Sequence, residues 1–288
     1  MSSHHHNEKF QSRFGAIMSM AGMAIGMGNV WRFPYMVGAY GGGAFIFAYL
    51  VAVVCIVAPL AIVEAGIGKG LGKGMVGTFT YGLKSSKLGK LFGIVFAGGY
   101  ATMNFFYFLV LAASAYFIYS SATSEWNTVQ ANLIYDQAMQ NQHMMAVIIA
   151  ILVLAMIYVT ARGVASGIET MSKYMMPLMV LFFVIAIVFA IVTVDDIATG
   201  YNWYLKPDWA LLKNPALWVA AVGQACFSVG IGPSCVLTYV SHLGRTDGVA
   251  QNILTVGVLD TCAGVLAGMA IIPACIGMGL TECVNKSL

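Results

Sequence analysis

Three ionisable side chains stand inside long apolar stretches of this sequence, at Arg32, Glu64 and Asp260. A charge in such surroundings needs a partner, so each of the three marks a candidate site. Asp260 either binds a hard monovalent cation, which takes oxygen ligands and a negative charge, or makes a hydrogen bond that packs two helices. Glu64 either satisfies backbone N–H groups of an interrupted helix or acts directly in a site. Arg32 requires an acidic or aromatic partner.

A glycine-rich segment near Arg32 predicts a break in a helix. Gly22, Gly26 and Gly28 follow one another closely, and each glycine costs a helix interior up to about 1 kcal/mol relative to alanine. The first two alone could form a helix-packing face, because glycines four residues apart allow two membrane helices to approach closely. Asn29 and Pro34 favour a break, because a packing face needs neither a buried amide nor a helix breaker.

A second break is predicted in the segment FSVGIGPS, where Gly230, Gly232 and Pro233 interrupt a long uncharged run. Interrupted helices expose backbone carbonyls that can coordinate a cation and N–H groups that can hold a carboxylate. Irregular backbone is tolerated inside a membrane only where it is buried in protein or lines a cavity. Two interrupted helices in corresponding positions of two repeats therefore indicate a transport site near the middle of the membrane.

The elements that carry these residues are predicted to be membrane-spanning helices. Of 288 residues, 60% are apolar and 9% are charged, against roughly 25% charged in a soluble domain, and the mean hydropathy is +0.83. Long runs contain no charged residue, and each can cross about 30 Å of hydrocarbon as a helix but is too long for a barrel strand. The sequence therefore predicts an all-α polytopic membrane protein, with helices in the runs 14–31, 33–63, 91–124, 137–161, 174–194, 214–244 and 261–281.

The loops between these runs differ in charge. Residues 69–90 contain five lysines and no acid, Arg162 and Lys173 bracket the next alternate loop, and Arg245 lies in the one after it. These loops and the N-terminus are therefore predicted to be cytoplasmic, in a multi-pass protein of the plasma membrane. The formal net charge of +3 follows from this bias and requires no nucleic-acid partner.

Neither a cofactor nor a cleaved targeting segment is predicted. Five of the six cysteines lie in apolar runs without a CxxC pair, and only Cys283 lies in a polar tail, which argues against a disulfide framework or a metal cluster. Histidines 4–6 could be a metal site or a short tag remnant, but three consecutive histidines at a chain terminus are expected to bind nothing specific. The polar start of the chain and a full-length first apolar run argue against cleavage.

Five segments resemble the neurotransmitter:sodium symporters in order and spacing, in particular the bacterial LeuT-type amino-acid transporters. They are AGMAIGMGNVWRFPY, YGGGAFIFAYL, IVEAGIGK, RGVASGIETMSKYMMP and NPALWVAAVGQACFSVGIG. The resemblance extends over about residues 10–277. It implies a LeuT-type inverted-repeat fold with the first and sixth helices broken, and sodium-coupled amino-acid symport by alternating access.

The resemblance also implies binding residues. The implied sodium ligands are the carbonyls of Gly22, Ala24 and Ile25 and the side chains of Asn29, Ser228 and Asp260. The implied substrate-binding residues are Ala24, Met27, Gly28, Tyr107, Phe227, Ser228 and Gly230. The implied gate and structural residues are Arg32, Glu64 and Phe10. Asn7 and Phe10 replace an arginine and a tryptophan that are frequent in the family, which leaves the inner gate open to question.

Departures from the family pattern bear on the substrate and on the ions. Gly26 replaces the aspartate of monoamine carriers, so the site suits a substrate that brings its own carboxylate, such as an amino acid. Gly230 replaces a commoner serine and leaves room for a bulky apolar or aromatic side chain. Asp260 replaces an asparagine, and Gly264 stands where relatives have a chloride-site serine or a substituting glutamate. Transport is therefore expected to be independent of chloride.

The resemblance implies a domain organisation: a cytoplasmic tail 1–13, a first repeat of five helices in 14–193, an extracellular loop 194–214, helices six and seven in 215–277, and an extracellular tail 278–288. The family core has ten helices, so the second repeat is incomplete. We expect a truncated chain that cannot transport alone.

Other functional classes are weighed against this interpretation. An intramembrane enzyme is disfavoured, because Ser234 and His242 are eight residues apart and no HExxH pattern occurs. A channel is disfavoured because a channel pore would more naturally repeat around an axis, whereas here two helices are predicted to break at one site near the middle of the membrane. An amino-acid sensor that binds substrate without transporting it stays open. The expected partners are sodium, an amino acid and the lipid bilayer, and a homodimer stays open.

Overall fold

The computed structural model describes residues 8–123, 133, 136–232, 235–244 and 248–280. Helices of α, π and 3₁₀ type account for the elements in this part of the chain. Its one β-type pairing is an isolated bridge between Gly42 and Pro207. The predicted all-α class is therefore confirmed for the residues described.

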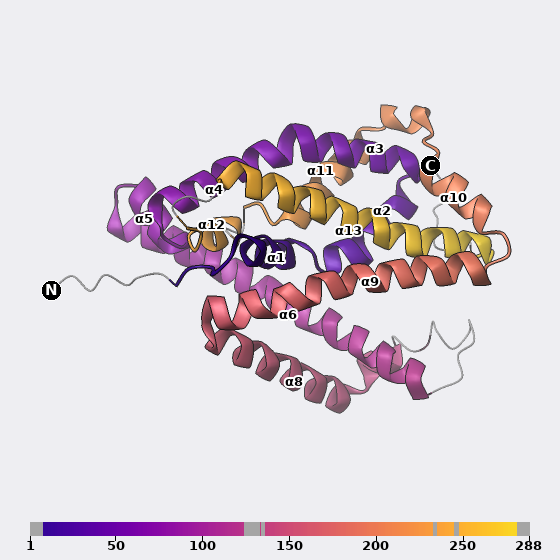
Figure 1. Ribbon diagram of the computed structural model, residues 1–288, viewed down its shortest axis with the longest axis horizontal. Coiled ribbons are helices and arrows are strands. Elements are labelled where there is room, and N and C mark those ends of the chain that lie inside the picture. The colour runs from indigo at the N-terminus through magenta and orange to yellow at the C-terminus, as the bar shows by residue number, and fades with distance from the viewer. Residues whose placement is uncertain (1–7, 124–132, 134–135, 233–234, 245–247, 281–288) are drawn as a thin grey trace.

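Five continuous helical stretches in the described residues are long and apolar enough to cross a membrane. Their elements are α3 (Gly43–Ala52) with η2 (Val53–Val57) and α4 (Ala58–Leu71), then α6 (Ser86–Thr123), α8 (Gln142–Ala161), η3 (Val164–Glu169) with α9 (Thr170–Thr193), and α13 (Val249–Gly277). Figure 1 shows the long helices running roughly along the long axis of the molecule, and α6 packs against α8 at one edge. The chain is a multi-pass membrane protein.

The first predicted break is present. It separates α1 (Arg13–Ala24) from η1 (Gly28–Arg32) and α2 (Phe33–Ala39), and the two halves are bent by 55°. The apolar run ended before Arg32, but the helix continues through it to Ala39. Arg32 can stay inside the span because other side chains bind it, as described below. Pro34 is tolerated because it lies in the first turn of α2, where a missing N–H group costs little.

The second predicted break separates α11 (Pro215–Val229) from α12 (Cys235–Val240). Gly230 ends α11 with a φ of +74°, and Gly232 has a φ of +96°. Both values lie in the left-handed region, which costs a residue with a Cβ atom more than glycine. The glycines therefore fix the place where this helix stops. Pro233 and Ser234 lie outside the described residues.

The predicted loop 194–214 is largely helical. It contains α10 (Ile197–Leu205) and the 3₁₀ turn η4 (Trp209–Lys213). Tyr204 on α10 is fully buried, and its hydroxyl donates a hydrogen bond of 2.9 Å to the carbonyl of Val265 on α13. This segment is thus a cap packed on α13, because its aromatic residues find buried positions there.

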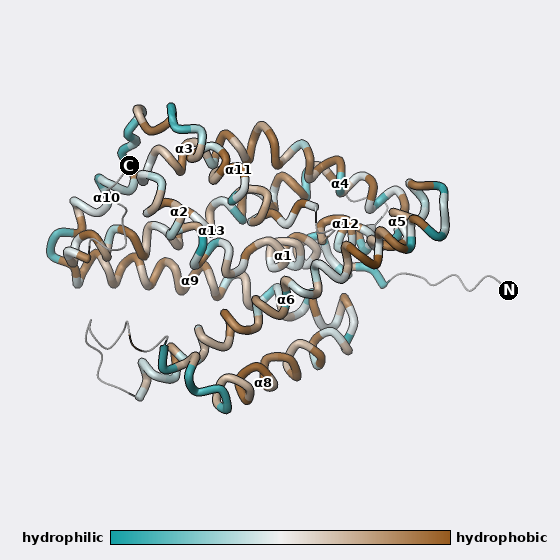
Figure 2. The backbone as a smooth tube through the Cα atoms, turned by 180° about the vertical axis from the view of Figure 1, so that it is seen from behind, coloured by the Kyte–Doolittle hydropathy of each residue, from teal (hydrophilic) through white to brown (hydrophobic). Residues whose placement is uncertain are grey.

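Hydropathy varies along the long helices in the way that a bilayer requires. Figure 2 shows hydrophobic segments along the middle of the long helices and hydrophilic ones mainly at their ends and connections. Large apolar side chains on α6, α8 and α9 are exposed, for example Phe105, Leu154 and Val192. The main buried cluster lies on other helices and contains Phe33, Phe45, Tyr49, Leu217, Val229 and Val256. Helices α1, α2, α3, α11 and α13 are therefore assembled around a shared interior.

The contact between α4 and α12 depends on one glycine. A Cβ atom on Gly68 would lie 2.4 Å from the backbone oxygen of Leu237, which cannot move aside as a side chain can. We expect Gly68→Ala to destabilise the protein by about 1–3 kcal/mol, measured by thermal unfolding in detergent. Gly66→Ala is the matched control, because no atom lies within 4 Å of its added carbon. Equal melting temperatures for the two variants would contradict this account of the packing.

Candidate functional site

A buried polar cluster joins the first broken helix, the second broken helix and α13. Asn29 donates hydrogen bonds of 2.9 Å to both the backbone oxygen and Oδ1 of Asp260. Ser228 donates a third, also of 2.9 Å, to the same Oδ1 atom. The exposed fractions of Asn29, Ser228 and Asp260 are 1%, 3% and 0%. Three of the predicted sodium ligands therefore meet although they are far apart in the sequence.

The three residues of this cluster lie at different positions in their helices: two lie next to a helix break and one lies near the middle of a continuous helix. Asn29 lies in the π turn η1, and its Oδ1 accepts a hydrogen bond of 3.2 Å from the backbone N–H of Gly26. Ser228 lies one residue before the end of α11. Asp260 lies near the middle of α13 and is held by rigid helix on both sides. The first two can approach Asp260 because both helices stop beside it.

Two further hydroxyl groups stand next to this carboxylate. The Tyr49 side chain on α3 interacts with Asp260, Ser228 and Thr261. The hydroxyls of Tyr49 and Thr261 and the Oδ2 atom of Asp260 are buried without a hydrogen-bond partner of standard geometry. Unpaired buried oxygen atoms are costly, so a cluster of them fits a cation ligand set. Sequence reasoning missed Tyr49 and Thr261, because hydroxyl groups are frequent in membrane helices.

Beside the cluster lies a cavity of about 340 Å³, which we call the helix-break cavity. Its walls include eight of the predicted residues: Gly22, Ala24, Ile25, Gly28, Tyr107, Phe227, Ser228 and Gly230. Helix α6 contributes residues that were not predicted, namely Tyr100, Met103 and Asn104. Together with Tyr107 they recur at intervals of three, one and three residues, which is one face of a helix. That spacing was the signal available in the sequence.

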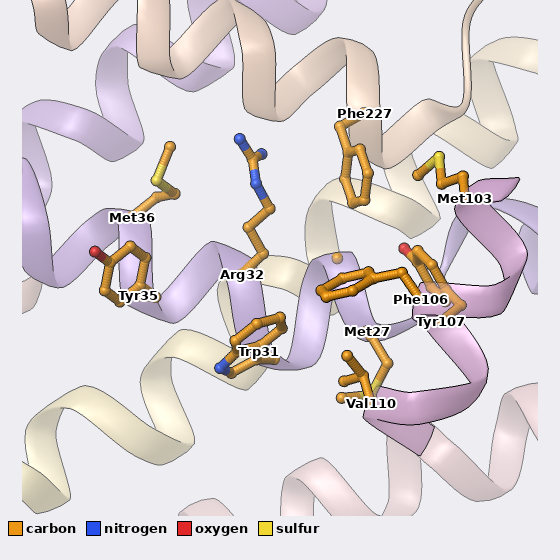
Figure 3. A pocket seen from close by; sticks show the side chains of 11 residues that line it. Met27, Trp31, Arg32, Tyr35, Met36, Met103, Phe106, Tyr107, Val110 and Phe227 are labelled. Carbon is orange, nitrogen blue, oxygen red and sulfur yellow. The ribbon is translucent and has the colours of Figure 1, made fainter. Parts of the chain in front are cut away.

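A second cavity of about 560 Å³, the Arg32 cavity, shares Gly28, Met103, Tyr107 and Phe227 with the first. Met27 lines this cavity and is absent from the walls of the helix-break cavity. In Figure 3, residues of the first helix face residues of α6, and Phe227 of α11 projects toward both. The two cavities thus share a wall that is built from residues of η1, α6 and α11.

Arg32 has both an aromatic and a polar partner. Its guanidinium lies 5.0 Å from the ring centroid of Phe227. Its Nη1 atom also donates a hydrogen bond to Oε1 of Gln224, and Nε2 of Gln224 donates one of 3.0 Å to the backbone oxygen of Gly28. Gln224 was not among the predicted residues. Its fully buried amide links the arginine to the broken backbone.

Glu64 lies at the other break. Its Oε2 accepts a hydrogen bond of 3.2 Å from the backbone N–H of Gly232, between α11 and α12. Such a contact satisfies a donor that the interrupted helix leaves unpaired. The geometry therefore fits the structural alternative for this carboxylate.

Phe10 lines neither cavity and lies beside the segment that follows α12. Its backbone N–H donates to the carbonyl of His242 at 3.2 Å, and the two rings meet edge to face at 6.3 Å. Beyond it, the backbone of Gln11 and the hydroxyl of Ser12 bind the buried carboxylate of Glu169 at 2.7 and 2.9 Å. The segment after residue 7 is thus tied to two helices. Asn7 lies outside the described residues, as do histidines 4–6 and Cys283.

The comparisons with known proteins agree with this geometry. The model of the sodium:neurotransmitter symporter family matches residues 7–148 and 133–283. An uncharacterized sodium-dependent transporter of Methanocaldococcus jannaschii is 31% identical over 93% of this chain and 56% of its own length. One of Haemophilus influenzae is 29% identical over 98% of this chain and 64% of its own length. The chain therefore spans about 56–64% of the length of these relatives. Both relatives are named as transporters, which agrees with the prediction that this chain is not an enzyme.

The solved structure of MhsT in complex with L-phenylalanine matches the fold. It covers 97% of this chain and 64% of the MhsT chain, with a TM-score of 0.83 and 27% identity. The LeuT-type fold with its broken helices is therefore shown. The chain belongs to the sodium:neurotransmitter symporter family.

Proposed function

We propose that this chain carries the ion and substrate sites of a sodium-coupled amino-acid symporter. The observation that supports this most is that two interrupted helices end at one cavity, next to the fully buried carboxylate of Asp260. Helix ends supply carbonyl and N–H groups there, and α13 supplies a fixed charge. A cation and a zwitterion can thus be bound side by side.

The sodium ions would be bound by oxygen atoms of the first broken helix (α1 and η1), of α11 and of α13. The first ion takes the carbonyl of Ala24 and side-chain oxygens of Asn29, Ser228 and Asp260. The second takes the carbonyls of Gly22 and Ile25. These carbonyls lie at or just after the end of α1, where helical hydrogen bonding stops. A hard cation prefers such oxygen ligands, and Asp260 balances its charge.

The substrate would lie across the helix break. Its carboxylate meets the N–H groups near Met27 and Gly28 and the hydroxyl of Tyr107, and its amine meets the carbonyls of Ala24, Phe227 and Ser228. Gly26 brings no carboxylate for a bare amine, and Gly230 leaves space for a bulky side chain. The L-phenylalanine in the MhsT complex supports an amino acid of apolar or aromatic type.

Alternating access would expose this site to one side of the membrane at a time. Phe227 lines both cavities and Arg32 lines the Arg32 cavity, so the contact between these two side chains can close the outer side. The segment around Phe10, bound to the end of α12 and to Glu169, can close the inner side. This assignment places the N-terminus in the cytoplasm and the protein in the plasma membrane, as the lysine-rich loops favour.

Chloride is not expected to take part. An anion close to Ser228 and Tyr49 would stand against the buried charge of Asp260, and like charges repel strongly away from water. Gly264 has no side chain that could bind an anion there. A Cβ atom at this position would lie 3.3 Å from the Phe33 ring, so the space beside it is already occupied. The charge that chloride would bring is therefore supplied by Asp260.

Sodium-dependent binding tests the proposed function. We expect the purified chain in detergent to bind radiolabelled leucine or tryptophan in sodium and not in choline. Asn29→Ala removes a ligand and the partner of Asp260, so it should weaken this binding by more than about tenfold. Asn202→Ala is the matched control, because Asn202 is exposed on α10. The same binding in choline as in sodium would refute sodium coupling.

Exchange of chloride for gluconate tests the role of Asp260. We expect the parent chain to bind its substrate equally in both sodium salts. Asp260→Asn removes the fixed charge, so its residual binding should become weaker in gluconate than in chloride by about tenfold. Glu64→Gln, a change at another membrane carboxylate, should stay insensitive to the anion. A chloride requirement in the parent chain would contradict this assignment.

A further inference from the structure

We propose that the corner between α4 and α6 binds the headgroup of an anionic phospholipid. The chain turns there through the short helix α5 (Met75–Gly82), and lysines lie on both sides of it in the sequence. We call Lys73, Lys84, Lys87 and Lys90 the lysine corner. None of the four lines either cavity, so this inference goes beyond the proposed function and does not depend on it.

The lysine corner concentrates positive charge in a part of the sequence that has no acid. Residues 65–124 contain five lysines and neither aspartate nor glutamate. The four lysines of the corner are exposed, and no salt bridge to any of them is found among the described residues. By contrast, Lys173 pairs with Glu169 at 2.7 Å. The charge of the lysine corner is therefore available to an anion from outside the chain.

The membrane boundary lies at this corner. Helix α4 ends at Leu71 and α6 begins at Ser86, and each belongs to a stretch that can span a membrane. A turn between two consecutive spans lies where the chain leaves the hydrocarbon, which is the level of the lipid phosphates. Figure 1 shows α5 at one end of the long axis of the molecule, in agreement with this position.

Close packing holds α5 against α6. A Cβ atom on Gly89 would lie 2.3 Å from Cα of Thr80, so glycine is what lets the two backbones approach this closely. The rings of Phe79 and Phe96 stack with their centroids 5.2 Å apart. The helix that separates Lys73 from the other three lysines is therefore fixed on the rest of the protein.

Apolar side chains accompany the lysines. Tyr81, Leu83 and Leu88 are 64%, 46% and 53% exposed. The ammonium group of Lys73 lies 5.8 Å from the centroid of the Tyr81 ring, so a charge and an aromatic ring stand together on this surface. Apolar side chains beside lysines are typical of a surface at the boundary between headgroups and acyl chains. Because a free phosphate ion would leave these apolar side chains in water, the surface fits a ligand that has acyl chains as well as a negative charge.

The start of α6 favours an anionic headgroup over a zwitterionic one. Lys87 lies in the first turn of α6, where the helix dipole disfavours a cation, and that turn contains no acid. Lys90 follows three residues later on the same side of the helix. A lipid phosphate beside them would offset the repulsion among these positive charges. Phosphatidylglycerol brings this phosphate without a cation, whereas phosphatidylcholine adds a positive group of its own.

Competition between two lipids tests this proposal. The purified chain in detergent is mixed with equal amounts of phosphatidylglycerol and phosphatidylcholine that have the same acyl chains, and the lipid adducts are counted by native mass spectrometry. We expect phosphatidylglycerol adducts to exceed phosphatidylcholine adducts by about tenfold in the parent chain. Lys87→Gln combined with Lys90→Gln should lower this ratio by at least about threefold. Lys206→Gln combined with Lys213→Gln is the matched control, because it removes two exposed lysines outside the corner, and it should keep the parent ratio.

Because the ratio compares two lipids on the same protein, partial unfolding of a variant does not imitate the expected effect. A parent ratio near one, an unchanged ratio in Lys87→Gln with Lys90→Gln, or an equal fall in the control would overturn the proposal. Glycerol phosphate, which carries the charge without acyl chains, is added in a separate arm at the concentration of the lipids. It should leave the ratio unchanged, and a fall to near one would show that the corner binds free phosphate groups and not a lipid.

Discussion

The structure depends on how the backbone is satisfied where two membrane helices stop. In hydrocarbon no water is available for unpaired N–H and carbonyl groups, so each break needs side chains from elsewhere. Asn29 accepts from Gly26, Gln224 donates to Gly28, and Glu64 accepts from Gly232. These polar side chains satisfy backbone groups that the two interruptions would otherwise leave unpaired.

The same residues connect the site to its surroundings. Asn29 binds both the broken backbone and Asp260, so the shape of the first break and the position of the carboxylate are fixed together. Gln224 binds both Gly28 and Arg32, so the arginine is tied to the backbone that borders the two cavities. A change in the backbone at the first break is therefore expected to move Arg32, which the proposed function assigns to the outer gate. This link is a physical basis for coupling ion and substrate binding to the opening of the site.

Glycine has two separate functions in this arrangement. At Gly230 and Gly232 it allows the left-handed backbone that ends α11. At Gly68 it allows the backbone of α12 to approach α4 closely, which sets the half-helix beyond the break against the rest of the protein. Helix α12 has only six residues, too few for a stable isolated helix, so its position depends on this contact with α4.

The sequence by itself determined the membrane class, the number of apolar runs, both breaks and the family, because these depend on composition, on glycine and proline, and on short motifs. Arg32, Glu64 and Asp260 could be identified as candidates because a charge in an apolar run is costly unless a partner or a ligand pairs with it. Only the tertiary structure decided which groups meet. Gln224 and Tyr49 are ordinary residues in the sequence, and their positions beside Arg32 and Asp260 follow from contacts between helices far apart in the chain. The path of the first helix through Arg32 and the packing of α10 on α13 likewise depend on partners that no local pattern reveals.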